Sequence, residues 1–168
     1  MVIDCRGLGA KVDIKNLRGV RGEVIWLEAP EVNITHLVRL MHPRYRIYIV
    51  PRKNNHYVIG ATQIESDDSR EISVRSCMEL LSAAYSVHTG FGEARIINTR
   101  ANCRPALPNN LPQIHHENGL IRVNGLFRHG FLLAPTLAQE IILALSEGEN
   151  FKTNLPDVYQ KNKHASVA

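Results

Sequence analysis

The sequence predicts an α+β fold in which a mixed, largely antiparallel sheet is flanked by helices. Strand-like segments fill the middle of the chain, and a turn signal, Asn54-Asn55, separates two of them. A helix-spaced apolar pattern follows Ser73, and a longer apolar run follows Gly130. With 168 residues, of which 44% are hydrophobic, the chain is long enough to bury a core.

The chain is expected to begin with the end of a buried strand at Val2–Cys5. Arg6–Ala10 then breaks this strand with a turn. Gly7-x-Gly9 resembles the start of a dinucleotide-binding fingerprint, but Val12 occupies the place of its third glycine. We therefore interpret the two glycines as part of a strand-terminating turn.

An antiparallel meander is expected next. Its predicted strands are Arg21–Leu27, Leu37–His42, Tyr45–Pro51 and His56–Thr62, and the last two should pair across the Asn54-Asn55 turn.

The following helix should begin after Ser73 as N-cap. Its apolar positions Val74, Cys77, Leu80, Leu81, Ala84 and Tyr85 should cover one face of the sheet.

The second half of the chain returns to strands and ends with a helix. Arg95–Thr99 is a predicted strand with Arg104 just beyond its end, and Pro105, Pro108 and Pro112 should hold an extended loop. Leu120–Val123 is a short strand. The run Phe131–Leu145 is apolar nearly all round, which predicts a buried helix closed by Gly148. Residues from Glu149 onward are polar and aperiodic, and the last of them are expected to be disordered.

Composition narrows the class of protein. The net charge of +4 comes with 14 arginines and 6 lysines, which favours bidentate anion recognition over a diffuse basic coat. No block of like charges or RNA-binding signature occurs, so we expect no nucleic-acid partner. Cys5, Cys77 and Cys103 form no C-x-x-C pair and suit a reducing compartment. Without a signal-like N-terminus or an apolar run of membrane-span length, the expected location is cytoplasmic, with no membrane partner.

The usual catalytic motifs are missing from the sequence. It contains no G-x-S-x-G, H-E-x-x-H or G-x-x-x-x-G-K pattern. His115-His116 is the one adjacent histidine pair, and we interpret it as solvated residues of a polar loop rather than as metal ligands. No metal site and no nucleophile are therefore predicted, which leaves binding or chemistry performed by a cofactor.

Arginines and a helix start indicate a site for anions. Arg104 could clamp a small carboxylate together with Tyr48, because a guanidinium matches carboxylate geometry and a phenol adds one directed donor. Gly130 precedes a helix whose free N–H groups favour negative charge. Spacing alone favours a structural ion pair at Arg104 and simple packing of Tyr48 over the carboxylate clamp, so the residues by themselves indicate no more than an anion-binding α+β domain.

Five segments together resemble the FAD-dependent D-amino-acid oxidase and glycine oxidase family, with the closest likeness to the glycine oxidases of thiamine biosynthesis. They are Val20–Val24, Tyr48–Arg52, Val58–Thr62, Cys103–Pro108 and Arg128–Pro135. The resemblance implies a flavin oxidase that deaminates a small amino acid by hydride transfer to flavin N5 and forms hydrogen peroxide. It implies no catalytic side chain, because this chemistry depends on orientation and electrostatics.

The resemblance also implies roles for individual residues. Arg104 would bind the substrate carboxylate with help from Tyr48, and Arg128 would lie at the edge of both substrate and flavin. The cofactor-binding residues would be Gly7, Gly9, Arg128, His129, Gly130, Phe131, Leu132 and Leu133.

Three positions depart from the family pattern. Arg46 replaces a common histidine, Gln63 a common methionine and Leu126 a common histidine. Because such side chains would line or border the substrate pocket, the preferred amine is left open.

The resemblance implies a division of the chain. Residues 1–16 would end the FAD domain, 17–103 would form the substrate-binding sheet, 104–148 would return to the FAD domain, and 149–168 would be a polar tail. The glycine-rich strand and helix that bind the ADP half of FAD do not occur in the sequence. We therefore expect a truncated or split oxidase with weak or absent FAD binding by this chain alone, and a complementary N-terminal chain or self-association. The alternative is a non-catalytic remnant that binds carboxylates or another protein.

Overall fold

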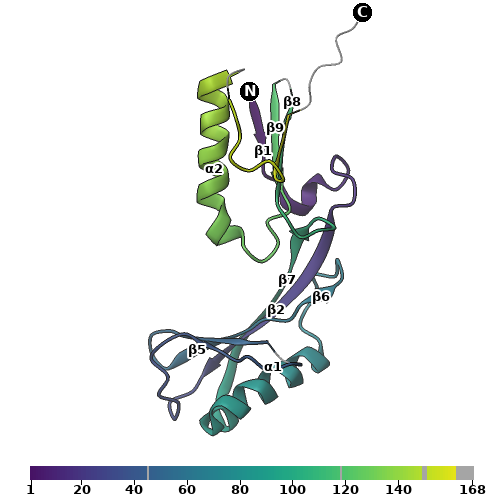
Figure 1. Ribbon diagram of the computed structural model, residues 1–168. Coiled ribbons are helices and arrows are strands. Elements are labelled where there is room, and N and C mark those ends of the chain that lie inside the picture. The colour runs from purple at the N-terminus through teal and green to yellow at the C-terminus, as the bar shows by residue number, and fades with distance from the viewer. Residues whose placement is uncertain (45, 118, 149–150, 162–168) are drawn as a thin grey trace, which may run out of the picture. The chain divides into compact units, whose positions relative to one another are not determined.

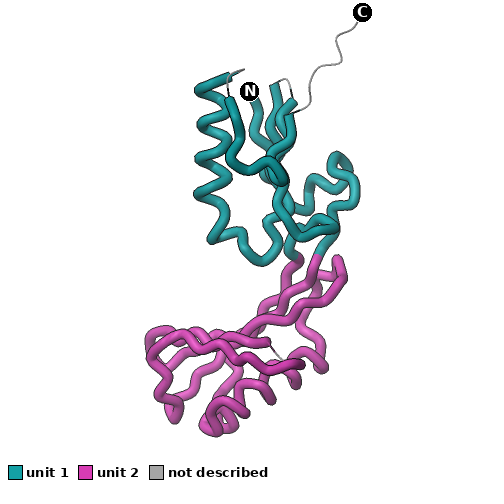
Figure 2. Tube along the Cα trace, in the orientation of Figure 1, with its two compact units in different colours: residues 1–19, 104–168 teal, residues 20–103 magenta. Residues whose placement is uncertain are grey.

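The computed structural model describes residues 1–44, 46–117, 119–148 and 151–161. The chain divides into two compact units, which are coloured separately in Figure 2. Unit 1 comprises Met1–Gly19 and Arg104–Ala168, and unit 2 comprises Val20–Cys103.

Unit 2 is built on a sheet of neighbouring strands in the order β3-β4-β5-β2-β6, with β7 also paired to β2 (Figure 1). β2, β4 and β5 pair antiparallel, which confirms the predicted meander. The strands are β2 (Arg18–Glu28), β3 (Val38–Arg39), β4 (Tyr48–Pro51), β5 (His56–Gly60), β6 (Ile64–Glu65) and β7 (Arg95–Ala106).

The predicted hairpin between β4 and β5 is confirmed. Asn54 and Asn55 both have positive φ, 60° and 54°, and the Arg52 N–H donates to the carbonyl of His56 at 2.7 Å. Asparagine tolerates this left-handed conformation at a lower cost than most residues, so the pair fixes the turn.

Helix α1 (Val74–Val87) starts where the sequence predicts. The Ser73 hydroxyl accepts a hydrogen bond from the Ser76 N–H at 3.1 Å and caps the first turn. Leu80 and Ala84 are buried, whereas Val74 and Tyr85 are 77% and 52% exposed. The helix therefore covers the sheet with a narrower face than its apolar pattern suggests.

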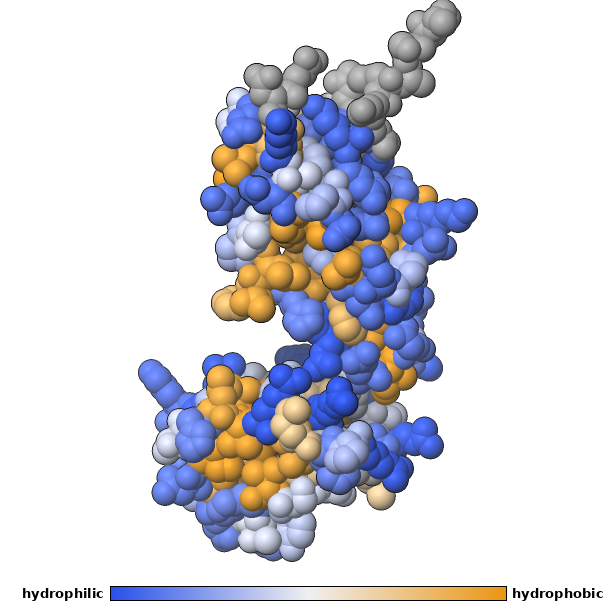
Figure 3. All heavy atoms as spheres, in the orientation of Figure 1, coloured by the Kyte–Doolittle hydropathy of each residue, from blue (hydrophilic) through white to orange (hydrophobic). Residues whose placement is uncertain are grey.

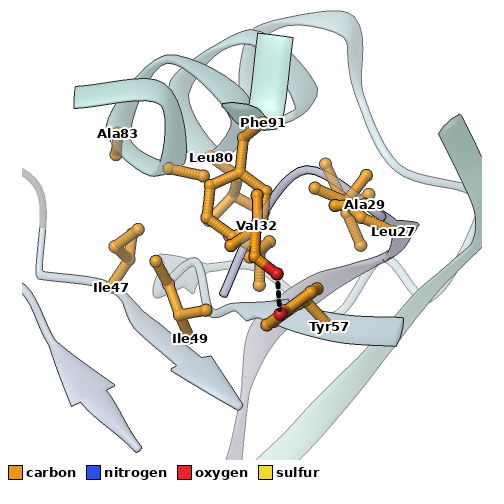
Figure 4. Packing of buried hydrophobic residues seen from close by; sticks show 12 residues of the cluster. Leu27, Ala29, Val32, Ile47, Ile49, Tyr57, Leu80, Ala83 and Phe91 are labelled. Atoms are coloured by element: carbon orange, nitrogen blue, oxygen red, sulfur yellow. Dashed lines mark hydrogen bonds between the residues drawn. The ribbon is translucent and has the colours of Figure 1, made fainter. Parts of the chain in front are cut away.

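The core of unit 2 lies between this helix and the sheet. Leu80 and Ala83 of α1 face Ile47 and Ile49, as Figure 4 shows, and Phe91 of the short η2 turn (Thr89–Glu93) completes the contact. The Tyr57 hydroxyl donates to the carbonyl of Val32 at 2.6 Å, so this buried phenol is satisfied.

A buried ion pair joins β2 to the loop before α1. Both Nε and Nη2 of Arg21 donate to Oε1 of Glu23, at 2.9 and 2.7 Å. The same guanidinium donates to the carbonyls of Asp68 and Glu71, each at 2.5 Å. The Glu23 side chain is fully buried and that of Arg21 is 6% exposed. Strand, loop and helix start therefore share one electrostatic anchor.

Unit 1 combines a mixed sheet with a long helix, α2 (Gly130–Glu147). The sheet order is β1-β9-β8-β10, in which β1–β9 and β8–β10 are parallel and β8–β9 is antiparallel. The remaining elements are β1 (Val2–Asp4), η1 (Gly7–Ala10), β8 (Gln113–Glu117), β9 (Leu120–Asn124) and β10 (Tyr159–Lys161). With unit 2 this confirms the expected α+β class with a largely antiparallel sheet.

The expectation that the helix after Gly130 is buried was wrong. Leu137, Ile141 and Ala144 pack on the sheet, but Ile142 is 64% and Leu145 42% exposed. Its 18 residues also meet the length and hydropathy of a membrane span, contrary to the prediction that no run approaches that length. Apolar residues occur around most of the helix, but one face alone packs against other described residues of unit 1. Val2 and Ile3 were predicted to lie in a buried strand, but they are exposed on β1, which is an edge strand of the sheet.

Three further expectations about unit 1 need correction. Arg104 and Pro105 lie within β7 rather than beyond it. His115-His116 belongs to β8 rather than to a solvated loop, and Tyr159 lies in a strand where aperiodic chain was expected. The first four residues of β7 are exposed on both faces, and the last four are buried or half-buried on both, so neither end shows the alternation that marks a strand. The disorder expected for the last residues concerns residues 162–168, which lie outside the described part.

Replacing Glu23 by alanine should destabilise unit 2 strongly. The change leaves the Arg21 guanidinium buried without its carboxylate, which costs about 3–5 kcal/mol. Urea unfolding followed by circular dichroism measures this loss. Glu31→Ala, at an exposed position, is the control and should stay within about 0.5 kcal/mol of the unchanged chain. Equal stability of the two variants would show that the pair is not an anchor.

The stability of unit 2 should also fall in acid. Burial alone would raise the pKa of Glu23, but hydrogen bonds from Ser76, Arg21 and Thr62 outweigh it and hold the pKa below its ordinary 4.5. The carboxylate therefore contributes its full stability above about pH 4.5 and loses it as pH falls through the folded pKa. Unfolding free energies at pH 6 and pH 3 should differ less in Glu23→Gln than in the unchanged chain. A difference of the same size in both would assign the acid sensitivity to other groups.

Candidate functional site

Segments that are far apart in the sequence meet in unit 1. The Asn124 side-chain amide donates to the carbonyl of Gly7 at 2.8 Å, and the Phe127 N–H donates to the carbonyl of Pro105 at 3.0 Å. These bonds bring the turn after β1, the end of β7 and the loop before α2 together. Both predicted arginine segments belong to this junction.

Gly125 makes this close approach possible. Its φ is +77°, and an added Cβ would meet the side chain of Leu107 at 2.7 Å. Both the backbone conformation and the space therefore require glycine. At Gly7 the backbone conformation alone favours glycine, because φ is +58° but an added Cβ would make an ordinary contact with Pro105 at 3.8 Å.

The turn after β1 is a short 3-10 helix, η1, as expected for a strand-terminating turn rather than a dinucleotide fingerprint. Hydrogen bonds from Arg6 lower the pKa of the Asp4 carboxyl to about 2 and hold the start of this turn. Gly9 lies exposed within η1.

The start of α2 offers backbone donors beside apolar side chains. The Leu133 N–H donates to the carbonyl of His129 at 2.8 Å, and His129 gives no side-chain cap. The N–H groups of the first turn precede that bond and carry the positive end of the helix dipole. Phe131 is fully exposed and Leu132 is 74% exposed. Figure 3 shows hydrophobic surface at this end of α2.

The two predicted arginines occupy different settings within unit 1. Arg104 is half-buried in β7, one residue before Pro105. Arg128 is exposed in the turn that leads into α2. Each therefore lies on a segment that the junction holds in place.

The remaining predicted substrate residues belong to unit 2. Tyr48 is half-buried on β4 and lies opposite Gly60 of β5, while Arg46 is exposed two residues earlier. Gln63 is exposed between the end of β5 and β6. Tyr48 therefore lies in the sheet, whereas Arg46 and Gln63 lie in the segments that flank β4 and β5.

The most strongly held side chains of unit 2 escaped prediction. Thr62 exchanges hydrogen bonds with Glu23, and Arg21 completes the group. Residues i and i+2 of a strand share a face, so Arg21 and Glu23 lie on the same face as buried Ile25. The sequence indicated this group only through two charged residues that alternate with the same spacing as a buried apolar residue of the strand.

The histidine pair of β8 is half-buried. The Tyr159 hydroxyl lies 2.6 Å from Nδ1 of His116, and burial lowers the pKa of both His115 and His116. Adjacent strand residues point to opposite faces, so the two rings do not converge on one ion. Among the described residues, no three His, Cys, Asp or Glu side chains are placed to hold a metal.

The junction in unit 1 fits part of a flavin. An exposed helix start suits the electron-rich N1–C2=O edge of the ring, and exposed Phe131 and Leu132 suit its apolar face. η1 does not open an α-helix, so it provides no pyrophosphate cradle of the dinucleotide type. The described residues therefore suit the ring half of the cofactor.

The family model described as FAD dependent oxidoreductase matches residues 1–143, and the chain belongs to this family. FAD is thus the cofactor of the family.

Named relatives agree with this assignment. The chain is 54% identical over 140 residues to a putative thiamine biosynthesis oxidoreductase ThiO of Rhizobium etli, covering 83% of the chain and 43% of the relative. It is 30% identical over 132 residues to a glycine oxidase of Geobacillus kaustophilus, covering 76% and 34%. The crystal structure of glycine oxidase from G. kaustophilus superimposes with a TM-score of 0.74 at 27% identity, over 94% of this chain and 43% of that one. The chain therefore spans less than half the length of these relatives.

Gly125→Ala should loosen the junction more than the same change at Gly119. Both glycines have positive φ, +77° and +79°, but an added Cβ meets nothing within 4 Å at Gly119. Gly119→Ala thus measures backbone strain alone, about 1 kcal/mol. Gly125→Ala should cost about 1–3 kcal/mol more, because Leu107 must move. Thermal unfolding compares the two variants, and equal losses would show that Gly125 is needed for its backbone conformation alone.

Proposed function

We propose that this chain carries the substrate-binding sheet and the flavin rim of an FAD-dependent oxidase that deaminates a small amino acid, with glycine as the leading candidate. The observation that carries the proposal is the junction of unit 1, where Arg104 and Arg128 lie on segments tied to the start of α2. The names of the ThiO and glycine oxidase relatives support this substrate class.

Arg104 is proposed to hold the substrate carboxylate. A guanidinium matches the two carboxylate oxygens with parallel N–H donors. Tyr48 would add one hydroxyl donor, and Arg46 and Gln63 would border the pocket. These contacts orient the α-carbon and need no proton transfer from a side chain.

Arg128 and the α2 start are proposed to border the flavin. The N–H groups of the first helical turn, from Gly130 to Leu132, stabilise negative charge at the edge of the ring. Leu133 follows in the helix, His129 precedes it, and Gly7 and Gly9 would lie nearer the rest of the cofactor. When bound, FAD accepts the two electrons of the amine and returns them to dioxygen, which yields hydrogen peroxide.

The two compact units are proposed to have separate roles. Unit 1 would be the FAD-domain portion, corresponding to the expected segments 1–16 and 104–148, and unit 2 the substrate-binding sheet expected at 17–103. The relatives supply more than half of their length outside the matched region, so a complementary flavin-domain chain is the proposed partner.

Peroxide release tests the proposal. The chain is expressed with the unmatched N-terminal part of the R. etli relative, purified, and assayed with glycine and FAD. We expect retained flavin absorbance after gel filtration and glycine-dependent peroxide, whereas the chain alone should retain little FAD. Flavin retention without turnover on any small amino acid would favour the alternative, a non-catalytic carboxylate-binding or interaction domain.

Substitution of Arg104 by alanine should weaken substrate binding. Loss of a charge-assisted bidentate contact costs about 1.5–3 kcal/mol, which corresponds to a rise in the glycine KM of roughly 10- to 150-fold. Steady-state kinetics of the assembled enzyme measure this change. Arg100→Ala, at an exposed position of the same strand, is the matched control and should leave KM unchanged. An unchanged KM in Arg104→Ala would remove this residue from the site.

A further inference from the structure

We propose that Glu23 is a positioning residue for Tyr48 and acts through Thr62 and Gly60. The inference rests on the proposed function in taking Tyr48 as a substrate ligand. All four residues belong to unit 2, so the argument needs that unit alone.

Gly60 makes room for the phenol of Tyr48. The two residues are direct partners in the β4–β5 register. A Cβ added at Gly60 would lie 2.6 Å from the Tyr48 hydroxyl oxygen and 2.7 Å from Cζ. The ring therefore extends across the neighbouring strand, with its hydroxyl over the place that a side chain would occupy. The position of the hydroxyl depends on where the Gly60 backbone lies.

β5, the strand beside Tyr48 in the sheet, ends at Gly60. Gly60 pairs with Tyr48 on one side and with Val24 of β2 on the other. The next residues are outside any strand. Residues 61–63 have no strand partner, so other interactions must hold the chain as it leaves Gly60.

Thr62 provides that interaction through Glu23. The Glu23 N–H donates to Oγ1 of Thr62 at 2.9 Å, and the Thr62 hydroxyl donates to Oε2 of Glu23 at 2.9 Å. The Thr62 N–H also donates to the Glu23 carbonyl at 3.2 Å. Main chain and side chain of one residue are thus bound to main chain and side chain of the other.

The second carboxylate oxygen of Glu23, Oε1, also accepts hydrogen bonds. Oε1 receives Arg21 and the Ser73 N–H, the latter at 3.3 Å. The carboxylate therefore connects the end of β5 to the helix start with one oxygen on each side. Because the group is fully buried, water does not compete for these bonds.

The arrangement assigns the end of β5 a function beyond stability. Glu23 and Thr62 fix the backbone of Gly60, and Gly60 fixes the Tyr48 hydroxyl. Gln63, the next residue after Thr62, is carried by the same backbone. Loss of the Thr62 hydroxyl should therefore move Tyr48 and weaken carboxylate binding, although Glu23, to which this hydroxyl donates, is fully buried.

The first test measures the position of Tyr48 without turnover. The assembled protein is labelled with 3-fluorotyrosine, and the Tyr48 resonance is assigned by its loss in Tyr48→Phe. Thr62→Val, which keeps the shape but removes the hydroxyl, should shift this resonance and leave those of the other tyrosines in place. Thr62→Ser should restore it, and Thr35→Val, at an exposed loop position, is the control. An unshifted Tyr48 resonance in Thr62→Val would overturn the proposal.

The second test separates substrate binding from turnover. Thr62→Val and Gly60→Ala should each raise the glycine KM by roughly 10-fold or more with kcat nearly unchanged, because a misplaced ligand weakens binding. Gly60→Ala displaces the Tyr48 hydroxyl directly, so it tests the contact between Gly60 and Tyr48 alone. Where Thr62→Val does not fold, Thr62→Ala removes the same hydroxyl and answers the question. If Tyr48→Phe raises KM and these variants do not, the positioning role fails while the substrate role of Tyr48 stands. If Tyr48→Phe itself has no effect, the proposed role of Tyr48 fails first.

Discussion

The buried pair of Arg21 and Glu23 is the constraint on which unit 2 depends. A carboxylate without solvent must have its oxygens satisfied, and here strand, loop and helix start each supply donors. The fold is therefore specified by a requirement for complete hydrogen bonding as much as by apolar packing. The apolar core between α1 and the sheet supplies the bulk of the burial, and the ion pair fixes how its edges meet.

Local rules predicted the elements that local chemistry determines. Ser73 as N-cap, the Asn54-Asn55 turn and Gly148 as C-cap lie where expected, because each acts within a few residues. The meander followed from strand-like segments on both sides of the Asn54-Asn55 turn. In β7 the prediction covered Arg95–Thr99 but not the rest of the strand, and β8 and β10 were missed. β7 and β10 pair with strands distant in the sequence, and none of the missed segments has an alternating pattern of large apolar side chains of its own.

The sequence predicted less of the candidate site than of the fold. The segments around Arg104 and Arg128 could be singled out by residue type, and the resemblance supplied their proposed roles. The junction that joins them could not be foreseen, because it depends on Asn124, Gly125 and the carbonyl of Pro105. Such contacts do not recur at the spacing of a helix or a strand, so no sequence pattern predicts them. The need for glycine at position 125 can be explained once the packing of Leu107 against it is known.

The discontinuity of unit 1 sets an order of events during synthesis. β1 pairs with β9, so the first strand must wait until more than a hundred further residues have been made. Unit 2 is continuous, and its β3–β4 and β4–β5 pairings join strands that follow each other in the sequence; such pairings form sooner than distant ones. Its sheet can assemble on the ribosome while β1 still lacks the strand with which it pairs. The nascent chain thus passes through a stage in which the backbone N–H and C=O groups of β1 have no ladder partner.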